Sequence, residues 1–537
     1  MSTPSSSHRV SLAAVITAAR AGSLRHAQAM FHAGGFAHQT DNPAALAVKA
    51  RLLKDEALRA PKALQPALFC EAADHYAAAD ALLSQPYTQI NEASLRLLAG
   101  DSVRAVARAS ALRNAVSDGA GFAETPYYLA ATRAEAHLIC GEFALAEHAL
   151  AEAMAHNPQG WSDHASTLRQ FELLSTALNA DAKWLDAYRP PASLNFAGHM
   201  GIAAALSGYL RREVDDFLDQ TCIGFGYGAL AVGSDIVIAE ALLARGAELN
   251  VVLPTQIDVF IAQSVTPYEP SWRPRFDACL AAAASVQCVT SVSGAYEPLA
   301  TKLAADVAMG ASVLNARRLE SEAVQLLVID EGEGRFGTGL GTSYLGDRWN
   351  NGGAQKIIVL PRNAPLTKPA PNATGREGRS DRQLAALLWI GFDGVDALDD
   401  ATFARMLDAE IRPLVTAARA LPTQPRWRFP CGNARVAAFD DPDCAWHYAQ
   451  ALLNMPTSRL PLIIAGHFAL AHSVVEPPAL IGPALADLAT VAASALPGVL
   501  TATETLTAAL FVNHADDLFA EEIGEAGPYH LFALSPR

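Results

Sequence analysis

The apolar pattern of this chain changes once, near residue 190, and that change limits the folds open to it. From about Ser11 to Leu185, Ala and Leu recur at three- and four-residue spacings without β-branched runs, which predicts a string of helices. From Ser193 onward, strand-like runs alternate with helical segments, which predicts α/β structure. The 537 residues are also too many for one core. We therefore expect a helical domain over 1–190, with further domains after it.

One segment of the helical part has the spacing of a paired-helix repeat. Small and apolar residues recur between Tyr127 and Pro158 at intervals that let two antiparallel helices nest: Ala134, Gly141, Phe143, Ala146, Leu150 and Ala153. This segment resembles a tetratricopeptide repeat, and a weaker copy surrounds Gly100. Stacked helix pairs imply a surface for a protein partner. An irregular helical bundle with the same role is the alternative.

Three strand-like runs follow the segment SLNFAGHM (193–200), namely Thr221–Phe225, Leu249–Leu253 and Val286–Thr290. Helical segments separate these runs, as a parallel sheet requires. The loop Gly226–Asp235 leads from the first run into a helix. A Gly-rich loop before a helix presents backbone N–H groups and a positive dipole end, which suits a phosphate.

The longer string GYGALAVGSDIVIAEALLARGAELNVVLP resembles the SLOG superfamily of Rossmann-like domains, in the style of the DNA-processing protein A family. The resemblance covers about Ser193 to Asp330 and implies a pocket for a nucleotide-like ligand. In that pocket, Asp235 would face a ribose or cap the helix. The residues expected to form the pocket are Gly198, His199, Gly228, Gly233, Ser234 and Asp235.

A structural role for the same residues is the alternative, with the glycines as turns and Ser234 and Asp235 as helix caps. Glu240, further along the helix, would face either the pocket or solvent. The loop after His199 is short and apolar, without a basic or proline-rich insert. We therefore expect ligand binding rather than hydrolysis in this Rossmann-like domain, which we place at 191–332.

Residues 333–382 are rich in Gly, Asn and Pro, which predicts a flexible linker with one short strand, Lys356–Leu360. A last domain is expected over 383–537. Its pattern reads as strand, helix, hairpin, helix and strand: Leu384–Phe392, Asp400–Ala418, Arg426–Phe439, Cys444–Leu453 and Leu460–Phe468. This β-α-β-β-α-β order is ferredoxin-like.

The order and spacing of these elements, through the closing GEAGPYHLFALSPR, resemble the class III adenylate/guanylate cyclase domain. The resemblance implies two aspartates that hold two magnesium ions, and a later helix with Asn and Arg for the ribose and triphosphate. Here these four positions read Gly391, Asn433, Ala486 and Thr490. Neither a glycine nor an amide supplies the charge of a carboxylate. We therefore expect a pseudo-cyclase domain without catalytic residues.

Cyclase domains act as head-to-tail dimers, so the resemblance also implies a homodimer through this domain. A shift in the alignment would make Asp393 a metal ligand, but it would supply no Arg between Ile481 and Pro497. A weak cyclase acting with a partner chain therefore remains the alternative, together with a nucleotide hydrolase in the Rossmann-like domain.

Composition excludes several classes of function. The net charge of −15 and the lack of clustered Lys and Arg argue against nucleic-acid binding. No apolar run approaches the roughly 20 residues of a membrane span, and the seven cysteines show no CxxC pair, so we expect neither a metal site nor disulfides. We predict a cytoplasmic signalling or scaffold protein with no certain cofactor.

Overall fold

The computed structural model describes residues 10–117, 123–202, 204–290, 298–330, 342–349, 352–361, 382–455, 460–474 and 478–537. The chain divides into two compact units, Met1–Pro190 and Pro191–Arg537. We refer to them as the helical unit and the sheet unit. Most of the linker expected at 333–382 lies outside the described residues.

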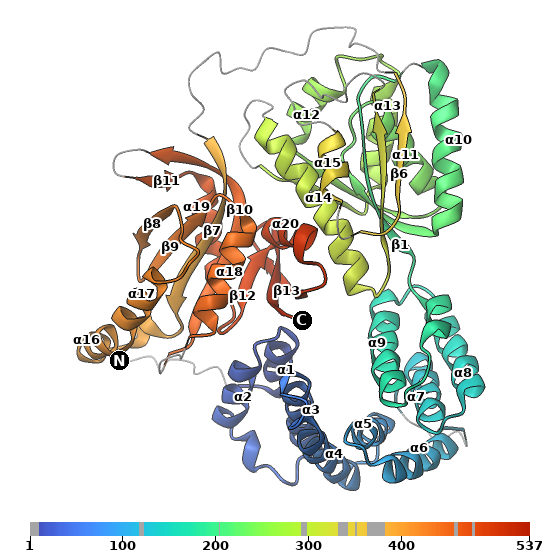
Figure 1. Cartoon of the computed structure of the whole chain (residues 1–537), viewed down its shortest axis with the longest axis vertical. Coiled ribbons are helices and arrows are strands. Elements are labelled where there is room, and N and C mark those ends of the chain that lie inside the picture. The colour runs from blue at the N-terminus through green and yellow to red at the C-terminus, as the bar shows by residue number, and fades with distance from the viewer. Residues whose placement is uncertain are drawn as a thin grey trace, which may run out of the picture. The chain divides into compact units, whose positions relative to one another are not determined.

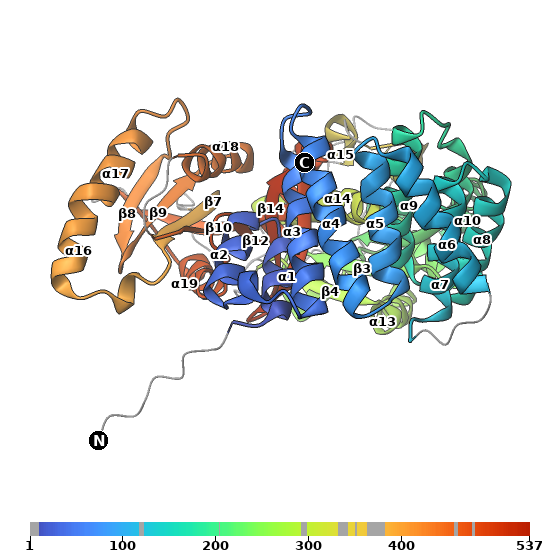
Figure 2. The same ribbon diagram turned by 90° about the horizontal axis from the view of Figure 1, so that it is seen from below.

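The helical unit is a succession of helices, and α3 to α8 each pack against the next (Figures 1 and 2). The predicted pair within 127–158 is present as α7 and α8, and Ala134, Ala146 and Leu150 are fully buried between helices. Its identity as a tetratricopeptide repeat stays a prediction. The helices are α1 (Leu12–Arg20), α2 (Leu24–Ala33), α3 (Pro43–Arg59), α4 (Gln65–Leu82), α5 (Pro86–Leu98), α6 (Ser102–Ser117), α7 (Pro126–Ile139), α8 (Phe143–His156) and α9 (Trp161–Ala177).

The first sheet of the sheet unit is parallel throughout, which confirms the Rossmann-like prediction. Its order is β4-β3-β2-β1-β5-β6. The short strand expected in the linker is the edge strand β6, paired with β5. The strands are β1 (Ala192–Gly198), β2 (Ile223–Gly228), β3 (Glu248–Leu253), β4 (Ser285–Cys288), β5 (Ala323–Ile329) and β6 (Gln355–Val359).

Helices cover both faces of this sheet (Figure 1). One face packs on a core shared with α10, α11, α12 and α13, and the other face packs on α14. The helices are α10 (Ala204–Thr221), α11 (Ser234–Ala244), α12 (Ile257–Ser264), α13 (Trp272–Ala282), α14 (Pro298–Arg318) and the short α15 (Thr342–Arg348).

The second sheet has the order β13-β14-β12-β10-β7-β9-β8, with β11 paired to β10. Its first elements follow the predicted β-α-β-β-α-β order, with a π-helical turn, Leu407–Ile411, between the two halves of the first helix. The strands are β7 (Arg382–Phe392), β8 (Trp427–Cys431), β9 (Ala434–Phe439), β10 (Leu462–Val474), β11 (Ala479–Ile481), β12 (Leu500–Thr503), β13 (Leu518–Ala526) and β14 (Tyr529–Pro536). The helices are α16 (Asp400–Met406), α17 (Arg412–Arg419), α18 (Pro442–Leu453), α19 (Pro483–Ala492) and α20 (Glu504–His514).

The two sheets share one hydrophobic core, because α14 packs on α20 (Figure 1). A Cβ built on Gly310 of α14 would overlap the backbone carbonyl of Ala508 in α20, so the two helices touch backbone to backbone. Arg317 and Arg318, at the end of α14, form ion pairs with Asp516 and Glu522 beyond α20. The Rossmann-like and C-terminal sheets are therefore layers of one body.

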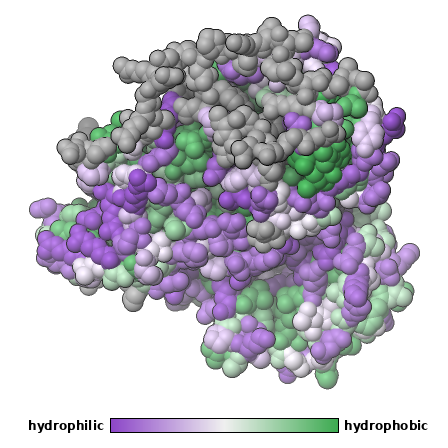
Figure 3. All heavy atoms as spheres, turned by 45° about the horizontal axis from the view of Figure 1, so that its top comes forward, coloured by the Kyte–Doolittle hydropathy of each residue, from purple (hydrophilic) through white to green (hydrophobic). Residues whose placement is uncertain are grey.

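No helix in the described part of the chain is long and apolar enough to cross a membrane. On the face drawn in Figure 3, hydrophilic residues surround separate hydrophobic areas. Large apolar side chains that are exposed include Val103 of the helical unit and Ile481 of the sheet unit.

The backbone contact at Gly310 predicts a large cost for adding one methyl group. Gly310→Ala should lower the free energy of unfolding by about 1–3 kcal/mol, because the added Cβ forces α14 away from α20. Gly208→Ala in α10 is the matched control, because a Cβ there meets nothing within 4 Å. That change should stabilise the protein by about 0.4–1 kcal/mol. Urea denaturation of both variants checks the pair, and equal effects would contradict the tight α14–α20 contact.

Candidate functional site

The strand order of the first sheet reverses between β1 and β5, because consecutive strands run outward from β1 on one side and from β5 on the other. In parallel α/β sheets, ligands bind beyond the carboxyl ends of the strands at such a reversal. Here those ends are Gly198 of β1 and Ile329 of β5. The residues predicted from sequence lie on the β2 side of this point, and a second polar cluster lies on the α14 side.

The predicted glycines bring the loops after β1 and β2 into close contact. A Cβ on Gly198 would overlap the side chain of Ser234, and one on Gly228 would lie 2.6 Å from the carbonyl oxygen of Phe196. Gly233 has a φ of +100°, and its backbone bridges Met200. These glycines therefore allow segments of the protein's own backbone to pack closely against one another.

The predicted polar residues at this place are buried and engaged by the chain itself. The Asp235 carboxyl group accepts hydrogen bonds from the backbone N–H groups of Gly198 at 2.8 Å and Ala231 at 3.1 Å. Ser234 donates to the carbonyl of His199, and Nε2 of the His199 ring lies 2.9 Å from the carbonyl oxygen of Leu360. The structure thus brings five of the six predicted residues together as a tight polar junction between β1 and α11. The sixth, Gly228, lies against Phe196 of β1 instead. Their role toward a ligand stays a prediction.

Burial has the largest effect on the pKa of Asp235. It raises the pKa of this carboxyl to about 8, against the lowering effect of the two N–H donors. A proton is therefore held on Asp235 at neutral pH, where an unfolded aspartate is ionised.

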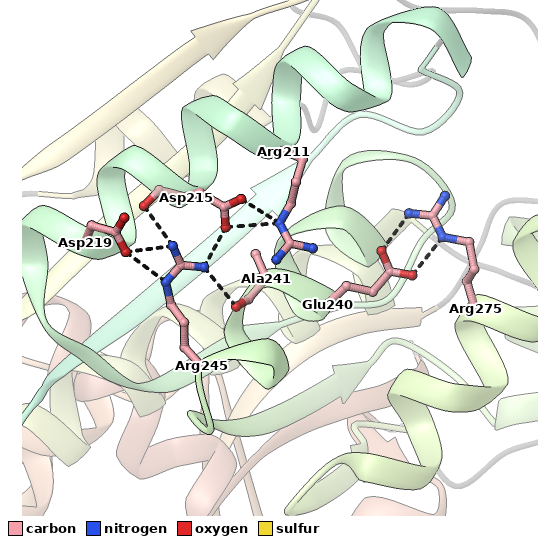
Figure 4. A network of polar contacts seen from close by, with 7 residues as sticks. All are labelled: Arg211, Asp215, Asp219, Glu240, Ala241, Arg245 and Arg275. Atoms are coloured by element: carbon pink, nitrogen blue, oxygen red, sulfur yellow. Dashed lines mark hydrogen bonds and ion pairs between the residues drawn. The ribbon is translucent and has the colours of Figure 1, made fainter.

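Glu240 lies on the outer layer with 30% of its side chain exposed, and Arg275 of α13 binds it there. Both carboxylate oxygens accept from the guanidinium at 2.7 Å (Figure 4). Beside this pair, Arg245 of α11 binds Asp215 and Asp219 of α10. These ion pairs hold α10, α11 and α13 together on the outer layer, so Glu240 is a structural residue.

On the α14 side of the sheet, three amide side chains form a row across adjacent strands, of which Asn195 and Gln325 are buried and Gln355 is exposed. Gln325 of β5 donates to Asn195 of β1 at 2.9 Å, and Gln355 of β6 donates to Gln325 at 2.7 Å. The register aligns these residues, since Asn195 pairs with Gln325 and Gln325 with Gln355. Gln325 also reaches the carbonyl of Leu345 at 3.5 Å, so the row supports α15.

A cluster of charged residues lies where α15 meets α14. Asp306 of α14 is 5% exposed and accepts from the hydroxyl of Tyr344 at 3.3 Å. Arg348 lies 3.6 Å from Asp306, and both Arg348 and Lys302 approach the Tyr344 ring, at 5.5 and 5.4 Å from its centre. Burial raises the pKa of Asp306 and raises that of Tyr344 to about 12. Sequence reasoning missed this cluster, because about 40 residues separate its two halves in the chain.

In the second sheet, the positions expected to hold metal-binding carboxylates are close together. Ile390 pairs with Arg435, which places Gly391 beside the turn that contains Asn433. A Cβ on Gly391 would lie 2.5 Å from the Trp389 ring and 3.3 Å from Cβ of Ala434. An aspartate at 391 would therefore require Trp389 to move.

The structure also describes the other residues considered for the cyclase-like site, namely Ala486, Thr490 and Asp393. Thr490 and Ala486 are exposed on α19, where the Thr490 hydroxyl donates to the Ala486 carbonyl at 3.1 Å. Asp393 is half-buried just after β7, and its N–H donates to the carbonyl of Pro461. Among the described residues, no group of three or more His, Cys, Asp or Glu side chains could hold a metal ion.

His467 lies within the central strand β10 of the second sheet. Its Nδ1 is 3.0 Å from the Thr503 hydroxyl, and its ring contacts that of Tyr529. Burial lowers its pKa to about 4, so the ring is neutral at physiological pH. This histidine is a satisfied core residue.

Comparison with known proteins gives matches of fold only. No protein-family model matches the chain, and no curated protein matches it. Solved structures that resemble its C-terminal part include the adenylyl cyclase CyaB from P. aeruginosa, at 9% identity over 29% of this chain and 94% of that one, with a TM-score of 0.24.

Two further matches are similar in extent. The guanylate cyclase domain of RhGC from Catenaria anguillulae is 10% identical over 29% of this chain and 97% of its own length, with a TM-score of 0.24. An adenylate/guanylate cyclase/hydrolase from Silicibacter pomeroyi is 17% identical over 29% and 98%, with a TM-score of 0.23.

The raised pKa of Asp235 predicts how stability depends on pH. The folded protein keeps this proton up to about pH 8, whereas the unfolded chain releases it near pH 4, so stability falls as pH rises between these values. Between these pH values, Asp235 alone lowers the free energy of unfolding by up to about 1.4 kcal/mol for each pH unit. Asp235→Asn cannot ionise and should flatten that part of the profile. Urea denaturation from pH 5 to 7.5 measures both, and parallel profiles would show that Asp235 is ionised in the folded state.

Proposed function

We propose that this chain is a non-catalytic signalling or scaffold protein, with a nucleotide-sensing Rossmann-like domain and an inactive cyclase-like domain that dimerises. The observation that carries the proposal is the pair Gly391 and Asn433. The order and spacing of the elements in the C-terminal domain resemble a two-magnesium cyclase, yet these adjacent positions carry no charge, and the Trp389 ring occupies the space beside Gly391.

The chemistry of cyclisation explains why Gly391 and Asn433 argue against catalytic activity. Two carboxylates must hold the two metal ions that activate the 3′-hydroxyl and neutralise the phosphates. Loss of both carboxylates removes both functions of the metals. The later helix also offers neither the Asn nor the Arg expected for the substrate, because Ala486 and Thr490 occupy those positions.

Nucleotide sensing is proposed for the first sheet because its strand order reverses at β1 and β5, the usual place for such ligands. The buried polar junction around Asp235 sits on one side of that point. In the proposal, the helical unit binds a protein partner through its stacked helices.

Cyclase assays test the catalytic part of the proposal. The full-length protein should form no cyclic AMP or cyclic GMP from ATP or GTP with magnesium or manganese, and Asp393→Ala should leave that baseline unchanged. Turnover that disappears in Asp393→Ala would identify Asp393 as a metal ligand and refute the inactive assignment.

Sedimentation of the full-length chain tests dimerisation. We expect a concentration-dependent dimer that Ile481→Lys weakens, since Ile481 is an apolar residue, 53% exposed, in strand β11 of the second sheet. Val103→Lys, at an apolar position 83% exposed in the helical unit, is the control and should leave the dimer intact. A monomer at every concentration would contradict the proposed role of the C-terminal domain.

A further inference from the structure

We propose that Lys302 and Arg348 form a phosphate-binding site on the α14 side of the β1–β5 reversal, and that this site takes the phosphate group of a nucleotide. The inference deepens the proposed nucleotide sensing and rests on it, and it assigns the contact to residues that the sequence motifs do not include.

The position of the cluster is the first argument. Helix α14 leads into β5, so in this parallel sheet its first turns lie near the carboxyl ends of the strands. Lys302 and Asp306 belong to those turns, and α15 follows β5 at the same edge. Apolar neighbours confirm the placement, because Ala197 of β1 and Ile329 of β5 pack on the core formed by Met309 and Leu345.

Charge and exposure are the second argument. Arg348 lies 3.6 Å from the buried carboxyl of Asp306, and Lys302 also interacts electrostatically with that carboxyl, whereas the chain as a whole carries a net charge of −15. Arg348 keeps 32% of its side chain exposed, so it is open to a ligand. Its Nε atom is buried and faces Asp306 at 3.6 Å, which leaves the terminal nitrogen atoms of the guanidinium to contact a ligand. A planar guanidinium presents donors in a geometry suited to phosphate.

Rigid support is the third argument. Leu345, three residues before Arg348, is buried with Met309 and with Val512 of α20. Gln325 and Gln355 approach the backbone of α15 at Leu345 and Gly346. The Tyr344 hydroxyl donates to Asp306, and the Tyr344 ring is close to both cations. The short helix is thus held from both sides, which is what a preorganised ligand contact requires.

Calorimetric titration of the full-length protein with ATP, ADP, AMP, adenosine and inorganic pyrophosphate tests the site. We expect ATP or ADP to bind and adenosine not to bind. Arg348→Gln and Lys302→Gln should each weaken binding at least about tenfold, because each removes a charge-assisted contact. Arg273→Gln is the matched control, since Arg273 is an exposed cation paired with Asp277 on α13. It should leave binding unchanged.

Asp306→Asn separates a phosphate site from a structural ion cluster. Binding should stay equal or become tighter, because the change removes the negative charge that faces the cations. Weaker binding in Asp306→Asn would overturn the assigned role. Thermal unfolding of each ligand-free variant reports folding, and Lys302→Gln retains the test if Arg348→Gln is unfolded.

The outcomes distinguish this site from the proposed nucleotide sensing. Nucleotide binding that is equal in wild type and Arg348→Gln overturns the site and leaves sensing in place. Pyrophosphate binding that depends on Arg348, without any binding of nucleotides, supports an anion site and overturns nucleotide sensing. No binding by any of the five probes overturns both.

Discussion

The backbone contact between Gly310 of α14 and Ala508 of α20 is the constraint on which the sheet unit depends. Helix α14 covers one face of the first sheet, and α20 covers one face of the second, so each sheet completes its core through the other domain's helix. A glycine is required at the crossing because no side chain fits between the two backbones. Separating the sheets would expose the apolar surface of both helices, which is strongly unfavourable in water.

Because the two sheets share this core, the sequence predicts the individual elements but not how the two sheets pack together. Strand runs, helices and the Rossmann-like sheet follow from local apolar spacing, and the structure confirms them. The packing of α14 on α20 depends on residues nearly 200 positions apart, which no local pattern reports. The middle of α14, residues 307–314, is buried throughout, but its sequence does not identify the elements that bury it.

In the candidate site, too, local sequence patterns predicted some residues, whereas contacts between distant segments could not be predicted. The glycines and Asp235 could be found from a loop that leads into a helix, and they do lie together at the end of β1. What sequence could not show is that the backbone N–H groups of Gly198 and Ala231 already donate to the Asp235 carboxyl group. Likewise, Lys302 and Arg348 belong to segments that become neighbours only when α14 crosses the sheet. Residue types indicated the chemistry, and the crossover connection decided which residues meet.

The geometry also restricts how a ligand at the first sheet could affect the second. Met309 of α14 and Leu345 of α15 share a buried cluster with Val512 of α20, so α15 and the cyclase-like domain are linked by continuous packing. A close backbone crossing cannot slide without steric overlap, and packed interiors deform little. Movement of α15 would therefore be passed to α20 as a displacement of whole helices rather than as rearrangement of single side chains. In the proposed dimer built on the second sheet, such a displacement would change the orientation of the Rossmann-like domains, and the cyclase-like domain would then have the mechanical role that the proposal assigns to it.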